Sequence, residues 1–190
     1  MKIIFAQGNP EPEYMQTRHN LGFSILNALA DSLNAKWTDK PKFHARAAEV
    51  TLAGHKAILV KPDTFYNETG LSARSIIDFY KLSPSDDFLV VHDDLALPFG
   101  TIRVRKEGSD AGNNGIKSLN THVGPIYTRI RIGTHTGLRI QMDDASFVLA
   151  KFTLDESKQL SKTIIPEMFE LIDQFCAGTI QISSHKTLDK

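Results

Sequence analysis

The sequence predicts an α/β fold: a single domain, residues 1–190, with a twisted mixed, mostly parallel β-sheet flanked by helices on both faces. Three observations support this prediction. Short segments rich in Ile, Val and Phe alternate with segments whose apolar residues recur every three to four positions. One Gly-containing turn between two strand segments indicates a hairpin. No internal repeat and no long Gly, Ser or Pro linker divides the 190 residues.

The expected strands are short and are bounded by Gly, Pro, Asn or Asp, which is typical of buried strands. They are Lys2–Gln7, Arg46–Leu52, Lys56–Lys61, Asp87–His92, Thr101–Lys106 and Tyr127–Gly133. The turn Leu52-Ala53-Gly54-His55 joins the second and third of them as an antiparallel hairpin.

The expected helices combine an apolar stripe with a recognisable start. They are Leu21–Leu33, Glu68–Lys81, Asn114–His122 and a last helix that ends at Ala177. Asn20 and Asn67 occupy the N-cap positions of the first two helices. The last helix opens with the capping box Thr153-Leu154-Asp155-Glu156, and Pro166 should kink it.

Composition narrows the class of protein. Hydrophobic residues are 41% and charged residues 23% of the chain, which excludes a disordered chain or a coiled-coil rod. The single cysteine, Cys176, cannot form an internal disulfide, and we expect it in the core. No apolar run has the length of a signal peptide or a membrane span. We therefore expect a cytoplasmic protein that does not bind membranes.

Charge is balanced over the whole chain, with 22 basic and 22 acidic residues, but it is uneven locally. Between Thr101 and Ile140 seven basic residues face only Glu107 and Asp110. The basic residues are Arg103, Arg105, Lys106, Lys117, Arg129, Arg131 and Arg139. This stretch is compatible with an anion held at one place on the surface, and equally with a solvated face of scattered ion pairs.

Polar residues follow four of the expected strands. Asn9 and His19 follow the first strand, Asn67 the Lys56–Lys61 strand, and Asp93 the Asp87–His92 strand. A further cluster, from Gly108 to Gly115 and including Asn114, follows the Thr101–Lys106 strand. Ligands of parallel sheets bind at the carboxyl ends of strands, so we expect all four clusters along one edge. Taken singly, the asparagines are explained as turn and capping residues, which is what most Asn in such places are.

These side chains suit the hydrolysis of a labile bond without a metal. A His held by a carboxylate through one ring nitrogen can take a proton from water with the other. Asn side chains can donate to a developing oxyanion. The chain lacks the spacings of a metal site, a P-loop, a dinucleotide fingerprint and a nucleophile elbow. Hydrolysis of a rather labile bond, such as an ester, fits best.

Six segments, in order along nearly the whole chain, resemble the motifs of bacterial peptidyl-tRNA hydrolases. They are Gly8-Asn9-Pro10 with Tyr14 and Thr17-Arg18-His19-Asn20, Lys61-Pro62 with Thr64-Phe65 and Asn67, Val91-His92-Asp93-Asp94, Gly112-x-Asn114-Gly115, Arg129-x-Arg131-Ile132-Gly133, and Phe147-Val148-Leu149-x-Lys151-Phe152. Each segment alone is a weak signal, and six in register are a strong one.

The resemblance implies an enzyme that hydrolyses the ester between a peptide and the 3′-terminal ribose of tRNA. It implies that His19 is the general base and that Asp93 orients it. Asn9 would read the peptide amide beside the ester. Asn67 and Asn114 would hold the attacking water, the carbonyl or the terminal adenosine.

The resemblance also implies how the rest of the substrate is held. Tyr14 and Phe65 would line the site for the substrate end, and Arg103, Arg105 and Arg131 would bind tRNA phosphates. Phosphate contacts position a nucleic acid without reading its sequence. The resemblance implies that no metal and no organic cofactor is used. It also implies that the partner is tRNA, as part of the substrate. Nothing in the sequence calls for a dimer, and we expect a monomer.

Four positions differ from the residues that the family favours. Tyr66 stands where Met is usual, Ala96 where Asp is usual, Ala111 where Gly is usual, and Asn113 where His is usual. These differences bear on the binding of the tRNA end and on the loop that contains Ala111.

Two other functions are compatible with parts of the pattern. A tRNA- or RNA-binding relative without catalysis would need the basic stretch but neither His19 nor Asp93. A metal-dependent hydrolase would use these two residues together with His92 and Asp94. Adjacent strand residues point to opposite faces, which argues against His92 and Asp93 sharing one metal.

Overall fold

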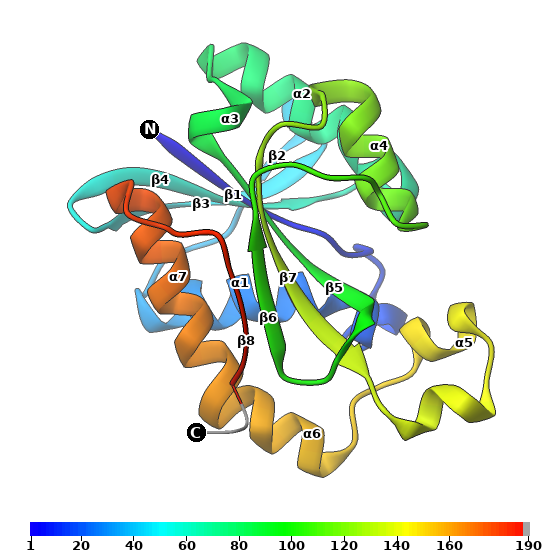
Figure 1. Ribbon diagram of the computed structural model, residues 1–190. Helices are drawn as coiled ribbons and strands as arrows, with labels where there is room; N and C mark the ends of the chain where they lie inside the picture. Colours follow the sequence, from blue (N-terminus) through cyan, green and yellow to red (C-terminus); the bar gives the residue numbers. More distant parts are fainter. Residues whose placement is uncertain (188–190) are drawn as a thin grey trace.

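One eight-stranded sheet organises the chain in the computed structural model, which describes residues 1–187 (Figure 1). The strand order is β2-β3-β4-β1-β5-β7-β6-β8. The strands are β1 Lys2–Ala6, β2 Thr38–Lys40, β3 Ala45–Leu52, β4 His55–Pro62, β5 Phe88–Pro98, β6 Thr101–Arg105, β7 Thr128–His135 and β8 Ser183–Lys186.

Parallel pairing is confined to the centre of the sheet. The pairs β4–β1, β1–β5 and β5–β7 are parallel. The pairs β2–β3, β3–β4, β6–β7 and β6–β8 are antiparallel. The prediction of a mixed α/β sheet is confirmed, but the expectation that it is mostly parallel is wrong. The β3–β4 hairpin and the short turn between β5 and β6, which lie on either side of β7, each reverse the direction of the chain, so β3 and β6 run against the central strands.

Helices cover both faces of the sheet, as predicted (Figure 1). The α-helices are α1 Leu21–Ser32, α2 Thr69–Tyr80, α3 Pro84–Asp87, α4 Asn114–Val123, α5 Asp144–Leu149, α6 Leu154–Gln159 and α7 Ile165–Ala177. Shorter turns are η1 Pro12–Tyr14, η2 Arg18–Asn20, η3 Pro41–Phe43, η4 Tyr66–Glu68, η5 Gly137–Gln141 and the π-helix η6 Leu160–Ile164.

Alternation along each strand divides the core into two layers. Ile4 on β1 and Val91 on β5 pack with α1 and α7, and buried Cys176 belongs to this layer, as predicted. Phe5 and Val90, one residue away on the same strands, pack with α2 and α4. Complete burial of each such side chain contributes about 1.5–3 kcal/mol of transfer free energy, so both layers hold the sheet in place.

The strand order reverses at β1, which lies between β4 and β5. The chain leaves β1 into α1 on one face, whereas it leaves β4 into α2 on the other face. A crevice forms at such a reversal, at the carboxyl ends of the strands.

Residues 106–113 reach this crevice by another route. Since β6 runs antiparallel to β7, its carboxyl end is at the opposite edge, and this segment crosses back to the start of α4 (Figure 1).

Several predicted element boundaries are corrected. The strand predicted to end at His92 continues to Pro98, and β2 and β8 were not predicted. The last helix is divided into α6, η6 and α7: Pro166 has no N–H for the carbonyl four residues before it, and the π-helix ends just ahead of it. Neither Asn20 nor Asn67 caps a helix with its side chain.

Within residues 1–187, none of the helices has both the length and the apolar character needed to cross a membrane.

Candidate active site

His19 and Asp93 are in direct contact at the point where β5 continues beyond its pairing with β1. The His19 Nδ1 atom lies 3.0 Å and 3.1 Å from the two carboxylate oxygens of Asp93. His19 comes from the short turn η2 that precedes α1, and 74 residues separate it from Asp93 in the sequence. The predicted contact is therefore present. Because an ionised carboxylate only accepts hydrogen bonds, Nδ1 carries the hydrogen and Nε2 is left as a basic nitrogen.

Tyr66 is a third member of this group. Its hydroxyl donates to Asp93 Oδ1 over 3.1 Å, and its ring stacks on the imidazole of His19 with centroids 3.6 Å apart and planes 15° apart. Gly115 in α4 leaves room for the phenol, since a Cβ at that position would lie 2.5 Å from Tyr66 Cε1. Tyr66 is buried and was identified from the sequence only as a departure from the expected Met.

Asn113 connects Tyr66 to α4. Its Oδ1 accepts the backbone N–H of Ile116 over 3.0 Å and so caps the helix, while its Nδ2 donates to the Tyr66 hydroxyl over 3.0 Å. The N-cap of α4 is thus also a neighbour of the His19–Asp93 pair.

Asn9 holds the turn that carries Tyr66. Its Oδ1 accepts the backbone N–H of Tyr66 over 2.9 Å. The Asn20 side chain, expected as a helix cap, instead exchanges two hydrogen bonds of 2.8 Å with the backbone N–H and C=O of Asn9. The β1–α1 connection and η4 are thereby fixed to each other through the two asparagines.

Burial and charge set the protonation of this group. Burial alone would raise the pKa of Asp93, but the charge and hydrogen bond of His19, with smaller contributions from His92 and Tyr66, lower it. Burial, and then the charge of Asp93, raise the pKa of Tyr66 well above its usual value. Burial lowers the pKa of His92 to about 4. At neutral pH Asp93 is therefore an anion, whereas Tyr66 and His92 are neutral.

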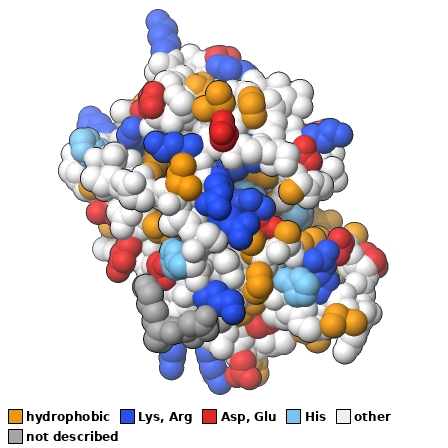
Figure 2. Space-filling model, viewed as in Figure 1, with side chains coloured by type: hydrophobic (Ala, Val, Ile, Leu, Met, Phe, Trp, Pro, Cys, Tyr) orange, Lys and Arg blue, Asp and Glu red, His pale blue; other side chains and the backbone are white. Residues whose placement is uncertain are grey.

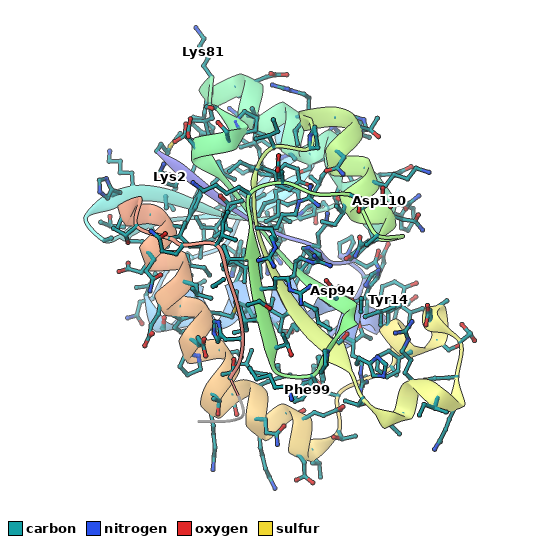
Figure 3. The ribbon with its side chains drawn as sticks, in the orientation of Figure 1. Lys2, Tyr14, Lys81, Asp94, Phe99 and Asp110 are labelled. Atoms are coloured by element: carbon teal, nitrogen blue, oxygen red, sulfur yellow. The ribbon has the colours of Figure 1, made fainter. Side chains whose placement is uncertain are left out.

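Two clefts meet at His19. The first, of about 500 Å³, runs between the segment 109–114 and α5, and includes Asp93, Asp94 and Arg131. The second, of about 680 Å³, runs along the start of α4 and includes Asn9, Phe65 and Asn67. Both include Asn114 as well as His19. Figure 3 labels two residues of the first cleft: Asp94 on β5, and Asp110 near the start of α4.

Most of the predicted site residues lie on these clefts. Phe65 is 60% exposed on the wall of the second cleft, and Asn67 is also exposed there. Tyr14 is half-buried in η1, where its carbonyl accepts from Thr17, and among the described residues it belongs to the wall of neither cleft. The structure therefore brings Asn9, His19, Phe65, Asn67, Asp93 and Asn114 together and leaves Tyr14 apart.

Four arginines form a square array on neighbouring strands. Arg103 is opposite Arg131, and Arg105 is opposite Arg129, in the β6–β7 register. The alternate residues of both strands are in the core layer of α1 and α7, so all four arginines are on the other face. Figure 2 shows Lys and Arg side chains gathered at the centre of this view, where β6 and β7 lie in Figure 1.

The four arginines differ in how far their charge is available. Arg129 is 3% exposed and donates to the carbonyls of residues 108, 109 and 125, so it holds the 106–113 segment. Arg131 Nε donates to Asp94 Oδ2 over 2.5 Å and remains on the cleft wall. Arg103 and Arg105 donate to Ser184 and to the Ser183 carbonyl of β8. Counting basic residues in the sequence could not separate Arg129 from the others.

Arg139 was counted in the basic stretch but not predicted as a site residue. It lies on the first cleft, where Nε donates to Asp144 Oδ1 over 2.8 Å and NH1 donates to the Leu95 carbonyl. The ion pair and the carbonyl bond together tie η5 to α5 and to β5. Within the part of the chain that the structure describes, no three His, Cys, Asp or Glu residues are grouped to hold a metal ion.

Comparison with known proteins gives one answer along the whole chain. The sequence profile of the family described as peptidyl-tRNA hydrolase matches residues 3–188. The peptidyl-tRNA hydrolase of Fusobacterium nucleatum is 37% identical over 190 residues, covering 100% of this chain and 93% of that protein. That of Synechocystis is 42% identical over 166 residues, covering 86% of this chain and 84% of that protein.

A solved structure agrees with the sequence relatives. The crystal structure of peptidyl-tRNA hydrolase from Acinetobacter baumannii superposes with a TM-score of 0.83 at 31% identity, and covers 94% of this chain and 89% of that one. The profile match, the relatives and the shared fold lead to one conclusion: this chain belongs to the peptidyl-tRNA hydrolase family.

Proposed function

We propose that this protein hydrolyses the ester bond between the peptide and the 3′-terminal ribose of peptidyl-tRNA. The observation that carries the proposal is the His19–Asp93 contact at the meeting point of two clefts. A substrate with two different ends, a peptide and an RNA, needs two channels that converge on one base. Family membership supports the same reaction.

The reaction uses His19 first as a base and then as an acid. His19 Nε2 takes a proton from a water molecule as the water oxygen bonds to the ester carbonyl carbon. Asp93 keeps the hydrogen on Nδ1 and stabilises the imidazolium that forms. When the tetrahedral intermediate collapses, the bond to the ribose 3′ oxygen breaks, and that oxygen takes the proton from His19. The products are a free peptide carboxylate and tRNA.

Asparagine side chains supply the neutral donors. Asn114 is on both clefts and is placed to donate an N–H to the carbonyl oxygen as its charge develops. Because Asn9 uses Oδ1 to accept from Tyr66, its Nδ2 is the group left for a substrate. Asn9 then donates to the carbonyl oxygen of the peptide amide next to the ester, which a free aminoacyl group lacks. Phe65 and Asn67 complete the second cleft, and Tyr14 contacts substrate only beyond it.

The arginine array is the proposed tRNA contact. Arg103, Arg105 and Arg131 share one face; Arg131 pairs with Asp94, whereas Arg103 and Arg105 donate to neutral oxygens, which leaves their charges for an anion. Phosphate oxygens match guanidinium donors and require no base sequence. Substrates that arise during translation also support a cytoplasmic location. The single sheet supports treating residues 1–190 as one domain, which we propose acts as a monomer without metal or cofactor.

A discharge assay tests the proposal. N-acetylaminoacyl-tRNA should be hydrolysed much faster than unblocked aminoacyl-tRNA. The His19→Ala variant should lose about 10²–10⁴-fold in kcat and still bind tRNA. The control is His55→Ala. His55 is the first residue of β4, at the end of the strand away from the clefts, and this variant should have the kcat of the parent protein. Turnover by His19→Ala near the parent rate would remove this residue from the mechanism, and binding without turnover by the parent protein would favour the RNA-binding alternative.

Salt dependence tests the arginine array separately. Arg103→Gln and Arg131→Gln should raise KM for full-length substrate, and they should also reduce the steepness with which KM rises with salt in the parent protein. A KM that does not respond to ionic strength in the parent would contradict phosphate binding by this face.

A further inference from the structure

We propose that Tyr66 and Asn113 are positioning residues that set the direction of every hydrogen bond in the His19–Asp93 pair. The inference rests on the proposed function, since it concerns the base of that reaction. It follows from four consecutive hydrogen bonds that join the N-terminus of α4 to the imidazole.

The first link fixes Asn113. A backbone N–H can only donate, so the Asn113 atom that accepts from Ile116 must be the amide oxygen. The amide therefore cannot be turned over without losing the cap of α4. Its nitrogen is left to face the Tyr66 hydroxyl, and a nitrogen of this kind can only donate.

The second link fixes the Tyr66 hydrogen. The phenol oxygen already accepts from Asn113, and its own hydrogen has Asp93 Oδ1 as its partner at 3.1 Å. Tyr66 is buried, and its raised pKa keeps that hydrogen in place at neutral pH. The hydroxyl therefore always presents a donor to the carboxylate.

The third link fixes His19. With one oxygen of Asp93 occupied by Tyr66, the carboxylate remains ionised and accepts the Nδ1 hydrogen of His19. The stacked phenol also hinders rotation of the imidazole, because its face lies 3.6 Å from the ring. In the neutral ring the hydrogen is therefore on Nδ1, and the lone pair of Nε2 is held in one direction. A helix cap thus determines which nitrogen of the base is free.

Other titratable groups around the pair do not supply this direction. His92 precedes Asp93 on β5, but its Nδ1 hydrogen goes to the Asp93 backbone carbonyl over 2.7 Å. Asp94 and Arg131 neutralise each other. Of these neighbours, only Tyr66 donates to the Asp93 carboxylate from outside η2.

Tyr66→Phe isolates the hydroxyl, because the stacked ring is kept. We expect kcat on N-acetylaminoacyl-tRNA to fall about tenfold or more, as for loss of a hydrogen bond to a charged group, with KM within about twofold of the parent. Tyr80→Phe, at the far end of α2, is the matched control and should leave both constants unchanged. A parent-like kcat for Tyr66→Phe would overturn the inference.

Two substitutions of Asn113 separate the cap from the relay. Serine and aspartate both cap helices well, so Asn113→Ser and Asn113→Asp should keep α4 folded. Asn113→Ser removes the donor to Tyr66. Asn113→Asp replaces it with an acceptor that competes with Asp93 for the Tyr66 hydrogen. We expect Asn113→Asp to lower kcat more than Asn113→Ser; equal or reversed effects at equal stability would contradict the relay.

Nitrogen-15 NMR of the His19 ring gives a readout without substrate. At a pH where the ring is neutral, the signals of the parent protein should show a hydrogen on Nδ1 and none on Nε2, and Asn113→Asp should mix the two tautomers while Tyr80→Phe should not. An unchanged tautomer in Asn113→Asp would refute the inference, whatever the activity. A correct tautomer in a parent protein that fails to release peptide would instead refute the proposed function.

Discussion

Replacing Glu156 by Gln tests how the turn that carries His19 is anchored to the C-terminal third of the chain. Arg18, the residue before His19, is completely buried and donates through NH2 to both carboxylate oxygens of Glu156 over 2.8 Å. Its NH1 donates to the carbonyls of Ala150 and Lys151 over 3.1 and 2.7 Å. The aromatic rings of Phe147 and Phe152 lie 4.6 and 5.0 Å from the guanidinium carbon.

The expected loss of unfolding free energy in Glu156→Gln follows from these contacts of Arg18. Removal of one partner from a buried ion pair costs about 3–5 kcal/mol, because the remaining charge stays buried. In Glu156→Gln the amide oxygen can still accept from Arg18 or from the backbone N–H of Thr153, which Glu156 caps over 2.7 Å. The two carbonyl bonds also remain, so we expect the low end, about 3 kcal/mol. For a chain of this length that lowers Tm by about 6–12 °C.

Urea and thermal unfolding measure the change, with Asp39→Asn as the control. Asp39 pairs with Arg46 at the surface, where the two side chains are 76% and 48% exposed, so its loss should cost less than about 0.5 kcal/mol. If Glu156→Gln costs no more than Asp39→Asn, Arg18 does not depend on that carboxylate, and the reasoning fails.

Two further predictions concern stability. Because the pKa of His92 falls from 6.5 to about 4 on folding, the unfolded chain binds the extra proton, and stability should drop by up to about 3 kcal/mol between pH 6.5 and 4. His92→Gln should lose this part of the pH dependence, and identical profiles would contradict it. Ala111 has a φ of 49°, in the left-handed region that glycine adopts more easily than alanine. Ala111→Gly should therefore raise the free energy of unfolding, measured in urea, by up to about 1 kcal/mol, whereas Ala145→Gly in α5 should lower it.

The central strands and the grouping of polar residues at their ends were predictable from local pattern. Apolar runs ending in Asn9, Asn67 and Asp93 predicted strands whose ends meet, because parallel neighbours share an edge. Placement of the Asn114 cluster at this edge was also correct, but the reason was wrong. Strand β6 is antiparallel to β7, and the cluster reaches the site only because residues 106–113 cross back.

Side-chain partners were not predictable in the same way. Asn20 has the sequence position of a helix cap, yet its side chain bonds Asn9, since the β1–α1 connection brings that backbone within reach. Arg129 and Arg131 look alike in sequence, but only Arg129 lies under the 106–113 segment. These side-chain partners depend on which loop covers which part of the sheet, and the spacing of residues along the sequence does not predict that arrangement.

The sequence alone determined the kinds of residue available for catalysis and the periodicity that sorts them onto strands and helices, because both are local properties of the chain. The tertiary structure decided which of them touch. Tyr66 differs from the residue expected at its position, and only strand order, the turn held by Asn9 and the gap at Gly115 place it against His19 and Asp93. Contacts between distant residues depend on how whole elements pack, and that packing is a property of the folded chain.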